Sequence, residues 1–231
     1  YPKVSTGLNP VAPGCYTSQV RIKQKHRQLE NELYLTEKIT AAAEVQCGRS
    51  YPSRELENAL SALLFSEFHD ALAGSASRPV EEDTLRLLDY GLEITDRLKH
   101  SAALALAQGE KEVIDGTSAI FFYNPHPYDI TGETGLPKQN WSTSFMYPKA
   151  KLNGVDVPTQ AEKENSNFNM DWRKRVTIQG TLKAGSLNRL DVYYHPIAKR
   201  PEYPEIVSSP EYVFDNGVMR VVIDTGTGLL K

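Results

Sequence analysis

The amino-acid composition changes abruptly near the middle of the chain. From Tyr16 to Ala107, Leu, Ala, Glu, Arg and Gln dominate and prolines are rare, a composition typical of helices. From Asp115 onward, Pro, Gly, Asn and Tyr are frequent, and short apolar or alternating runs stand between turn residues, as in β-structure. We therefore predict an α+β, multi-domain chain. A helical domain is expected over residues 1–110, and an antiparallel β-sandwich-type domain, truncated at its C-terminal end, over residues 111–231.

The first predicted helix covers residues 17–46. Its apolar residues recur at intervals that place them near one face, and Gly48 is suited to a left-handed helix end. The residues on that face are Ile22, Leu29, Leu33, Ile39 and Ala43. A helix of roughly 30 residues is about 45 Å long. Because a disulfide needs Cα atoms within ~7 Å, Cys15 and Cys47 at its two ends are predicted to be free thiols.

Two further amphipathic helices follow. Ser53 is placed to cap the second helix, which is expected to end at Gly74. Pro79 suits the first position of the third helix, since its missing N–H has no partner there. The second apolar stripe is Leu56, Leu60, Leu63, Leu64, Phe68 and Leu72; the third is Leu85, Leu88, Leu92, Leu98, Ala102 and Leu106. Three such helices joined by short loops predict an antiparallel three-helix bundle.

Several short strands are predicted in the second half. The strongest local signal is Asn153-Gly154 between short alternating arms over 151–157, because Asn-Gly supplies the two positive φ angles of a type I′ hairpin. Other strands are expected at 118–123, 175–179, 187–194 and 212–224, with a long surface loop over 163–171. Strands at this spacing favour a sandwich.

The charge balance narrows the choice of partners. Lys and Arg number 26 against 29 Asp and Glu, for a formal net charge of −3, so no field across the whole chain favours nucleic acid. No apolar run approaches the ~20 residues of a bilayer span. We predict neither a nucleic-acid nor a membrane partner. The sequence leaves open a homo-oligomer, and whether the protein is cytoplasmic or exported.

The two ends suggest a piece of a longer protein. The chain begins at Tyr1 without Met, and residues 218–231 read as a strand, a turn and the first residues of a second strand. An unpaired strand edge is a poor natural terminus. We expect a fragment.

His69 stands out among the five histidines because of its neighbours. It is followed directly by Asp70, at the expected last turn of the second helix, and then by small residues that leave room for a ligand. Imidazole is a common zinc ligand, and a neighbouring carboxylate can accept a hydrogen bond from a sugar hydroxyl or a supporting group. A histidine near a helix C-terminus is also explained by the helix dipole alone. One His and one Asp do not make a closed metal site.

Several segments together resemble a known family. The run from Gly14 to Gln19 (Gly-Cys-Tyr-Thr-Ser-Gln) is followed by basic residues on a long helix and then by residues 68–75 (Phe-His-Asp-Ala-Leu-Ala-Gly-Ser). This order and separation are similar to the segment that follows the catalytic barrel in the family 38 α-mannosidases. Residues 120–125 and 214–228 resemble the opening of that family's β-region. Of these segments, only the His-Asp run is specific.

The resemblance implies a zinc-dependent, retaining exo-α-mannosidase acting on terminal α-linked mannose of glycans. By this resemblance, His69 matches the last Zn²⁺ ligand and Asp70 a carboxylate that hydrogen-bonds the sugar. The other ligands, the nucleophile and the general acid would belong to an N-terminal catalytic barrel that this chain lacks, so no catalytic residue is assigned here. The zinc site would be incomplete and the chain inactive by itself. Ala12-Pro13 departs from members that carry a Trp just before the Gly.

Two alternatives remain open from the residues. A His-Asp-type metal-dependent phosphohydrolase also places adjacent His and Asp on a helix, and it would need a further histidine, for which only His26 and His100 are available. A non-catalytic module that binds glycan or docks another domain is the second alternative. The 12 tyrosines suit a sugar-stacking surface, and they suit a β core equally well.

Overall fold

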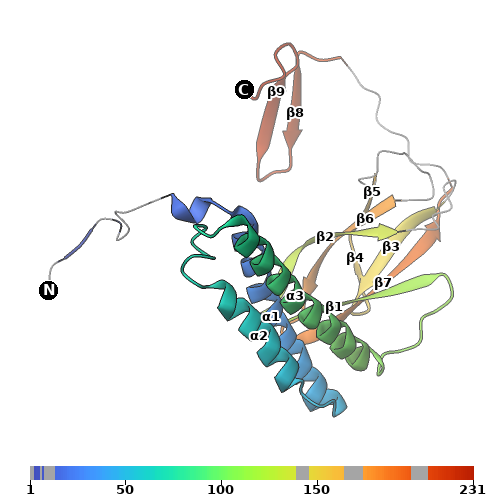
Figure 1. Ribbon diagram of the computed structural model, residues 1–231. Helices are drawn as coiled ribbons and strands as arrows, with labels where there is room; N and C mark the ends of the chain where they lie inside the picture. The colour runs from blue at the N-terminus through green and yellow to red at the C-terminus, as the bar shows by residue number, and fades with distance from the viewer. Residues whose placement is uncertain (1–2, 6, 8–13, 139–145, 164–173, 199–207) are drawn as a thin grey trace. The chain divides into compact units, whose positions relative to one another are not determined.

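A computed structural model describes residues 3–5, 7, 14–138, 146–163, 174–198 and 208–231 (Figure 1). The chain forms two compact units, Tyr1–Pro196 and Ile197–Lys231. The first unit contains three helices followed by two antiparallel sheets, which confirms the predicted α+β class with a bundle before a sandwich-type region. The finer division at residue 110 stays a prediction. Most of the predicted loop over 163–171 lies outside the described residues, as do Ala12 and Pro13.

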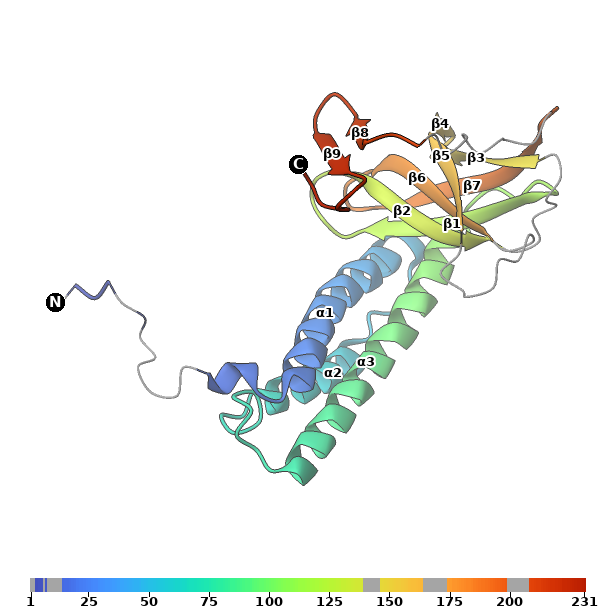
Figure 2. The ribbon, with the colours of Figure 1, turned by 90° about the horizontal axis from the view of Figure 1, so that it is seen from above.

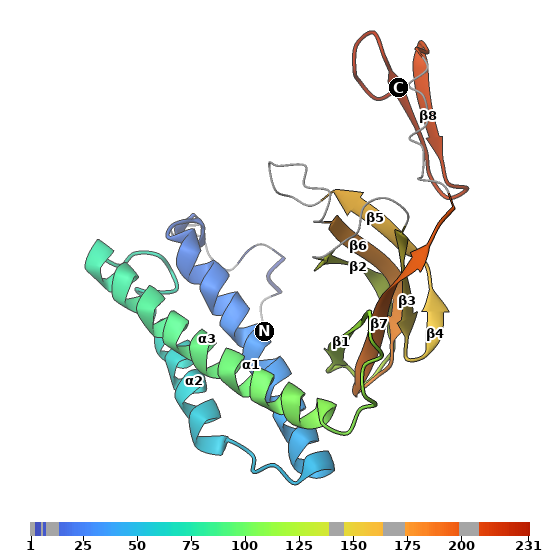
Figure 3. The same ribbon diagram turned by 90° about the vertical axis from the view of Figure 1, so that its right-hand side faces the viewer.

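The helices reverse direction at each connection (Figures 2 and 3). They are α1 (Val20–Cys47), α2 (Ser53–Ser66) and α3 (Arg78–Ala107), preceded by a short 3₁₀ helix, η1 (Cys15–Thr17). Gly48 ends α1 with a φ of 67°, as expected, and Pro79 lies in the first turn of α3. Both cysteines are free thiols. Within the described residues, no helix has the length and apolar character needed to cross a bilayer.

The bundle core confirms the apolar faces predicted for α1 and, in large part, for α3. Ile22, Leu29 and Leu88 are fully buried, and Leu85 and Leu92 pack half-buried against them.

The stripe predicted for the second helix was partly wrong. Leu60, Leu64 and Phe68 are 42%, 54% and 55% exposed. The buried residues of α2 are Leu56, Ala59, Ala62, Leu63 and Ser66, a narrower face than the one predicted, and the helix ends at Ser66. Leu60 and Leu64 lie beside this buried face and Phe68 follows the end of the helix, so all three remain at the surface.

Two sheets face one another in the second half of the first unit. Their strands are β1 (Thr117–Asn124), β2 (Ile130–Lys138), β3 (Met146–Leu152), β4 (Val155–Val157), β5 (Thr159–Lys163), β6 (Lys174–Leu182) and β7 (Ser186–Pro196). One sheet has the order β1-β7-β3-β4 and the other β2-β6-β5. Leu152, Leu190 and Val192 from the first sheet pack against Val176 and Ile178 from the second. β2 and β5 were not predicted.

The type I′ turn was predicted correctly, and a second turn was missed. Asn153 and Gly154 have φ of 50° and 82° between β3 and β4. The single strand predicted over 212–224 was wrong, because it is a hairpin of β8 (Glu211–Asp215) and β9 (Arg220–Asp224). Its turn contains Asn216 and Gly217, with a φ of 81° at Gly217. The Asn216 side chain accepts hydrogen bonds from the N–H groups of Val218 and Met219.

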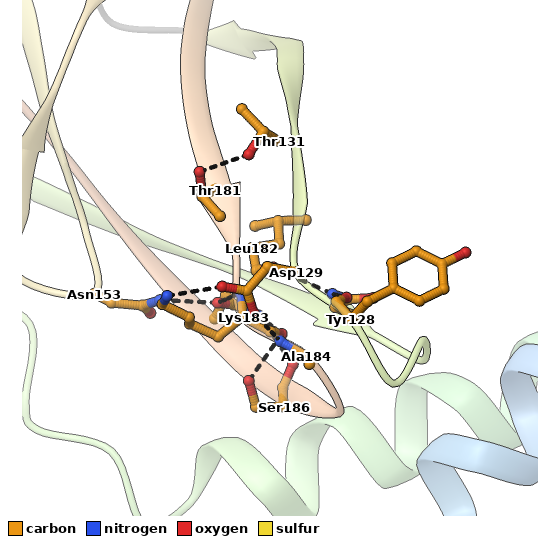
Figure 4. Close-up of polar contacts among 11 residues, drawn as sticks. Tyr128, Asp129, Thr131, Asn153, Thr181, Leu182, Lys183, Ala184 and Ser186 are labelled. Carbon is orange, nitrogen blue, oxygen red and sulfur yellow. Dashed lines mark hydrogen bonds and ion pairs between the residues drawn. The ribbon is translucent and has the colours of Figure 1, made fainter.

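Side chains also tie together the turns at one end of the sandwich (Figure 4). The fully buried Asn188 accepts hydrogen bonds from the Asn153 side chain and the Lys183 N–H, both at 2.8 Å. Asp129 accepts hydrogen bonds from the Lys183 ammonium (2.8 Å) and the Ala184 N–H (2.9 Å). The hydrogen bond from Lys183, followed by that from Ala184, holds the pKa of Asp129 below its usual value.

These hydrogen bonds predict a pH-dependent contribution of Asp129 to stability. A lowered pKa in the folded state stabilises the fold above the pKa of the unfolded chain, and this contribution is lost as pH falls through the folded-state pKa. Asp129→Asn should therefore lower the urea midpoint at pH 7, and its difference from the wild type should be smaller at about pH 3. Urea unfolding followed by circular dichroism at both pH values measures this. Glu57→Gln, an exposed carboxylate on α2, serves as the control. Equal midpoints of Asp129→Asn and wild type at pH 7 would contradict the prediction.

Candidate functional site

His69 and Asp70 lie in the segment that joins α2 to α3. The sequence placed them in the last turn of a helix ending at Gly74, and that placement was wrong, because α2 ends at Ser66. The Glu67 and Phe68 N–H groups bond to carbonyls three residues back, which tightens and ends the helix. Residues 68–74 then form consecutive turns, with the Ala71 and Leu72 N–H groups both donating to the Phe68 carbonyl.

The His69 imidazole is open to solvent. Its side chain is 79% exposed and that of Asp70 is 56% exposed, with 3.4 Å between His69 Nε2 and Asp70 Oδ2. The Phe68 ring lies beside the imidazole at 4.3 Å between centroids. The Ser75 hydroxyl donates to Asp70 Oδ1 at 3.1 Å. The imidazole is therefore accessible to a ligand, and Ser75 helps to orient the neighbouring carboxylate.

A single imidazole provides one metal-coordinating position. Structural and catalytic zinc sites use three or four protein ligands. Among the described residues, no group of three or more His, Cys, Asp and Glu side chains could hold a metal ion. His69 thus fits zinc as one donor, and a complete site needs donors from elsewhere.

The two other histidines considered for a phosphohydrolase are engaged locally. The His26 side chain is 13% exposed, and its Nε2 lies 3.0 Å from Glu67 Oε1. His100 Nδ1 lies 2.8 Å from the carbonyl oxygen of Asp96, one turn earlier on α3. The structure does not assemble the two with His69 into a metal-binding group within its described part.

The segment that carries His69 is held against the start of α1. The Ser18 hydroxyl lies 2.7 Å from the Gly74 carbonyl oxygen, and the Gln19 side-chain amide donates to the Ala76 carbonyl at 2.7 Å. Gln19 itself has a left-handed backbone with a φ of 45°. Ser18 and Gln19 belong to the run that resembles the family 38 α-mannosidases, and no role was predicted for them. The structure shows that they anchor the loop that presents His69.

Gly74 permits this close approach. Its φ is 81°, and a Cβ added there would lie 2.3 Å from Ser18 Oγ and 2.8 Å from the Ser18 carbonyl oxygen. Any side chain at position 74 would therefore strain the backbone and push the loop away from α1. Next to this contact, Arg21 of α1 pairs with Glu81 of α3 at 2.9 Å, and the Glu81 side chain is only 12% exposed.

Comparison with known proteins finds a family match for the helical part. Residues 13–106 match the family model described as the α-mannosidase middle domain. "Alpha-mannosidase 2C1" of Mus musculus is 29% identical over 126 residues, covering 54% of this chain and 12% of that protein. "Alpha-mannosidase G" of Dictyostelium discoideum is 25% identical over 169 residues, covering 63% of this chain and 16% of that protein. The chain thus spans a small part of the length of these relatives.

Solved structures agree in fold over nearly the whole chain. A glycosyl hydrolase family 38 protein from Enterococcus faecalis matches with a TM-score of 0.64 and 16% identity, covering 94% of this chain and 30% of that one. An α-mannosidase from E. faecalis V583 matches with a TM-score of 0.59 and 15% identity, covering 94% and 29%. The helical part of the chain therefore matches an α-mannosidase middle domain. The curated relatives and the fold over nearly the whole chain support the predicted resemblance to a fragment of a family 38 α-mannosidase.

The anchored loop gives a prediction for Gly74→Ala, with Gly48→Ala as a matched control. Both glycines have positive φ, but no atom lies within 4 Å of a Cβ added at Gly48. Gly48→Ala should cost about 1–2 kcal/mol of unfolding free energy for the left-handed backbone alone. Gly74→Ala should cost more, and should speed amide hydrogen exchange across residues 67–77. Equal losses in the two variants, with unchanged exchange in this segment, would show that the Ser18 contact does not hold the loop.

Proposed function

We propose that this chain is the middle and adjoining β-region of a zinc-dependent, retaining exo-α-mannosidase that removes terminal α-linked mannose from glycans. The observation that carries the proposal is the exposed, anchored imidazole of His69 within a segment matched by the α-mannosidase middle domain. Proteins named α-mannosidase are its longer relatives. In this proposal residues 1–110 form the middle domain and residues 111–231 belong to the β-region.

His69 supplies one of the zinc ligands in this assignment, and Asp70 bonds a sugar hydroxyl. When bound, zinc would hold hydroxyls of the terminal sugar and assist its distortion toward the oxocarbenium-like transition state. Asp70 accepts a hydrogen bond from the substrate through an oxygen not used by Ser75. The remaining ligands, the nucleophile and the general acid come from an N-terminal catalytic barrel. A chain with one metal donor and no acid–nucleophile pair is expected to be inactive.

Exposed apolar side chains near His69 support a second domain at this site. Phe65 is 71% exposed and Phe68 is 55% exposed, close to the imidazole in sequence, and Leu64 is 54% exposed on the last turn of α2. Apolar side chains that lie together at a surface often mark a site of contact with another protein or domain, whereas single scattered ones do not. A barrel that supplies the other zinc ligands has to approach His69 over these residues, and burying them would stabilise its docking.

The proposal predicts that the 231-residue chain hydrolyses no aryl α-mannoside, because the nucleophile and acid lie elsewhere. Purified chain is incubated with the substrate, and release of the aryl group is followed by absorbance. A mock preparation from the expression host serves as the control for contaminating mannosidase. Turnover that stays with the chain through successive purification steps would refute the division of the site.

A second prediction concerns His69 in the complete enzyme, with the barrel present. His69→Ala removes one zinc ligand, and kcat/KM should fall by more than about 100-fold, since even residues that only orient a ligand typically cost 10–100-fold. Zinc content after dialysis, measured by mass spectrometry, should fall in parallel. His100→Ala, an equally exposed histidine on α3, should leave both unchanged. Normal zinc content in His69→Ala would remove His69 from the site.

A further inference from the structure

The outer face of the four-stranded sheet carries an elongated hollow. A cavity of about 830 Å³ lies between this face and residues 110–116, the segment that follows α3. A second cavity of about 490 Å³ lies toward β4 and shares Lys151 and Tyr193 with the first. Volumes of 300–1,000 Å³ are typical of small-molecule sites. The two cavities therefore adjoin at Lys151 and Tyr193, and together they are called the groove.

The Tyr193 ring lies along the sheet. Tyr193 is on β7, and its hydroxyl lies 3.5 Å from Asp156 Oδ1 on β4. β3 lies between these strands, so two strand spacings, about 9.5 Å, separate their backbones. A ring standing upright from the sheet does not reach that far. The Tyr193 side chain must therefore lean across β3 toward Asp156, and it lines both cavities.

Arg189 lies on the same face of β7 as Tyr193, four residues earlier, and is held by several contacts. Its Nε lies 2.9 and 3.1 Å from the two carboxylate oxygens of Asp191, and its Nη1 donates to the Lys111 carbonyl at 2.5 Å. The guanidinium also lies 6.0 Å from the Phe121 ring centroid, and its side chain is 15% exposed. These contacts hold the donors and acceptors of Arg189 and Asp191 in place before any ligand arrives.

The charges that line the groove leave no excess of positive charge, since the basic Lys111, Lys149, Lys151 and Arg189 stand with the acidic Glu110, Glu112, Asp115, Asp156 and Asp191. Asp191 neutralises Arg189, and Lys151 stands in cross-strand register with Asp191 on one side and Asp156 on the other. Phosphate binding needs an excess of positive charge, which this arrangement lacks. Donors and acceptors in adjacent pairs suit hydroxyl groups, each of which donates and accepts. A flat aromatic face beside them suits the apolar face of a sugar ring.

We propose that this groove binds a neutral oligosaccharide, with one sugar ring on Tyr193 and hydroxyls bonded to Asp191 and Lys151. The site uses no residue of the segment around His69, so it goes beyond the proposed mannosidase function. Only the choice of a mannose oligomer as the first probe rests on that function.

The experiment titrates the 231-residue chain with α-linked mannotriose, maltotriose and inorganic phosphate, following binding by calorimetry and amide chemical shifts. Tyr193→Ala removes the ring and should weaken trisaccharide binding by at least about tenfold. Tyr193→Phe keeps the ring and should bind within threefold of the wild type, a loss of less than ~1 kcal/mol. Tyr128→Ala removes a 60% exposed tyrosine elsewhere on the sandwich and serves as the control. Circular dichroism melting shows that each variant is folded.

Saturable binding of either trisaccharide that depends on Tyr193 supports the proposal. Dependence with maltotriose alone supports the groove while counting against mannose as its ligand. Absence of saturable binding, equal binding by Tyr193→Ala, or binding of phosphate at Arg189 and Lys151 overturns it. Zinc and His69 enter none of these measurements, so the failure of the groove and the failure of the mannosidase assignment are distinguished.

Discussion

The contact between Gly74 and Ser18 determines where the only proposed metal donor of this chain lies. The turns after α2 have few buried apolar residues of their own, and hydrogen bonds to Ser18 and Gln19 tie them to the start of α1. The start of α1 is in turn held to α3 by the pair Arg21–Glu81. Packing of the long helices, centred on Leu29 and Leu88, keeps these ends in register. The position of His69 therefore depends on core residues far from it along the helices.

The sequence predicted the helices well because each carries its own periodic signal. The buried face of α1 and the free cysteines followed from spacing and length alone. The end of α2 did not, since apolar residues continue to Leu72 while the backbone turns at Ser66. Apolar spacing cannot show whether a leucine meets a neighbouring helix or lies on the flank of the buried face. That distinction depends on the arrangement of α1 and α3.

In the β-region, too, local sequence did not determine every strand and turn. Asn-Gly pairs favour turns. The turn at 153–154 was predicted correctly, whereas one long strand was wrongly predicted across the turn at 216–217. β2 and β5 contain Gly, Ala, Glu and Lys, which are depleted in strands, so their local strand propensity is weak and pairing with β6 determines them. For the candidate site, the sequence identified His69 and Asp70 as neighbours. It could not show that Ser18 approaches Gly74, a contact between residues 56 positions apart.

The two proposed sites differ in how complete they are within this chain. His69 offers one metal donor, and a zinc site needs three or four protein ligands, so its proposed function needs donors from outside this chain. The groove around Tyr193 is built from β3, β4, β7 and the segment after α3, and its Arg189 is already oriented by Asp191, Lys111 and Phe121. Groups held in place before binding lose little freedom when a ligand arrives. The proposed carbohydrate-binding surface would therefore need only this chain, whereas the proposed hydrolysis would also need groups from outside it.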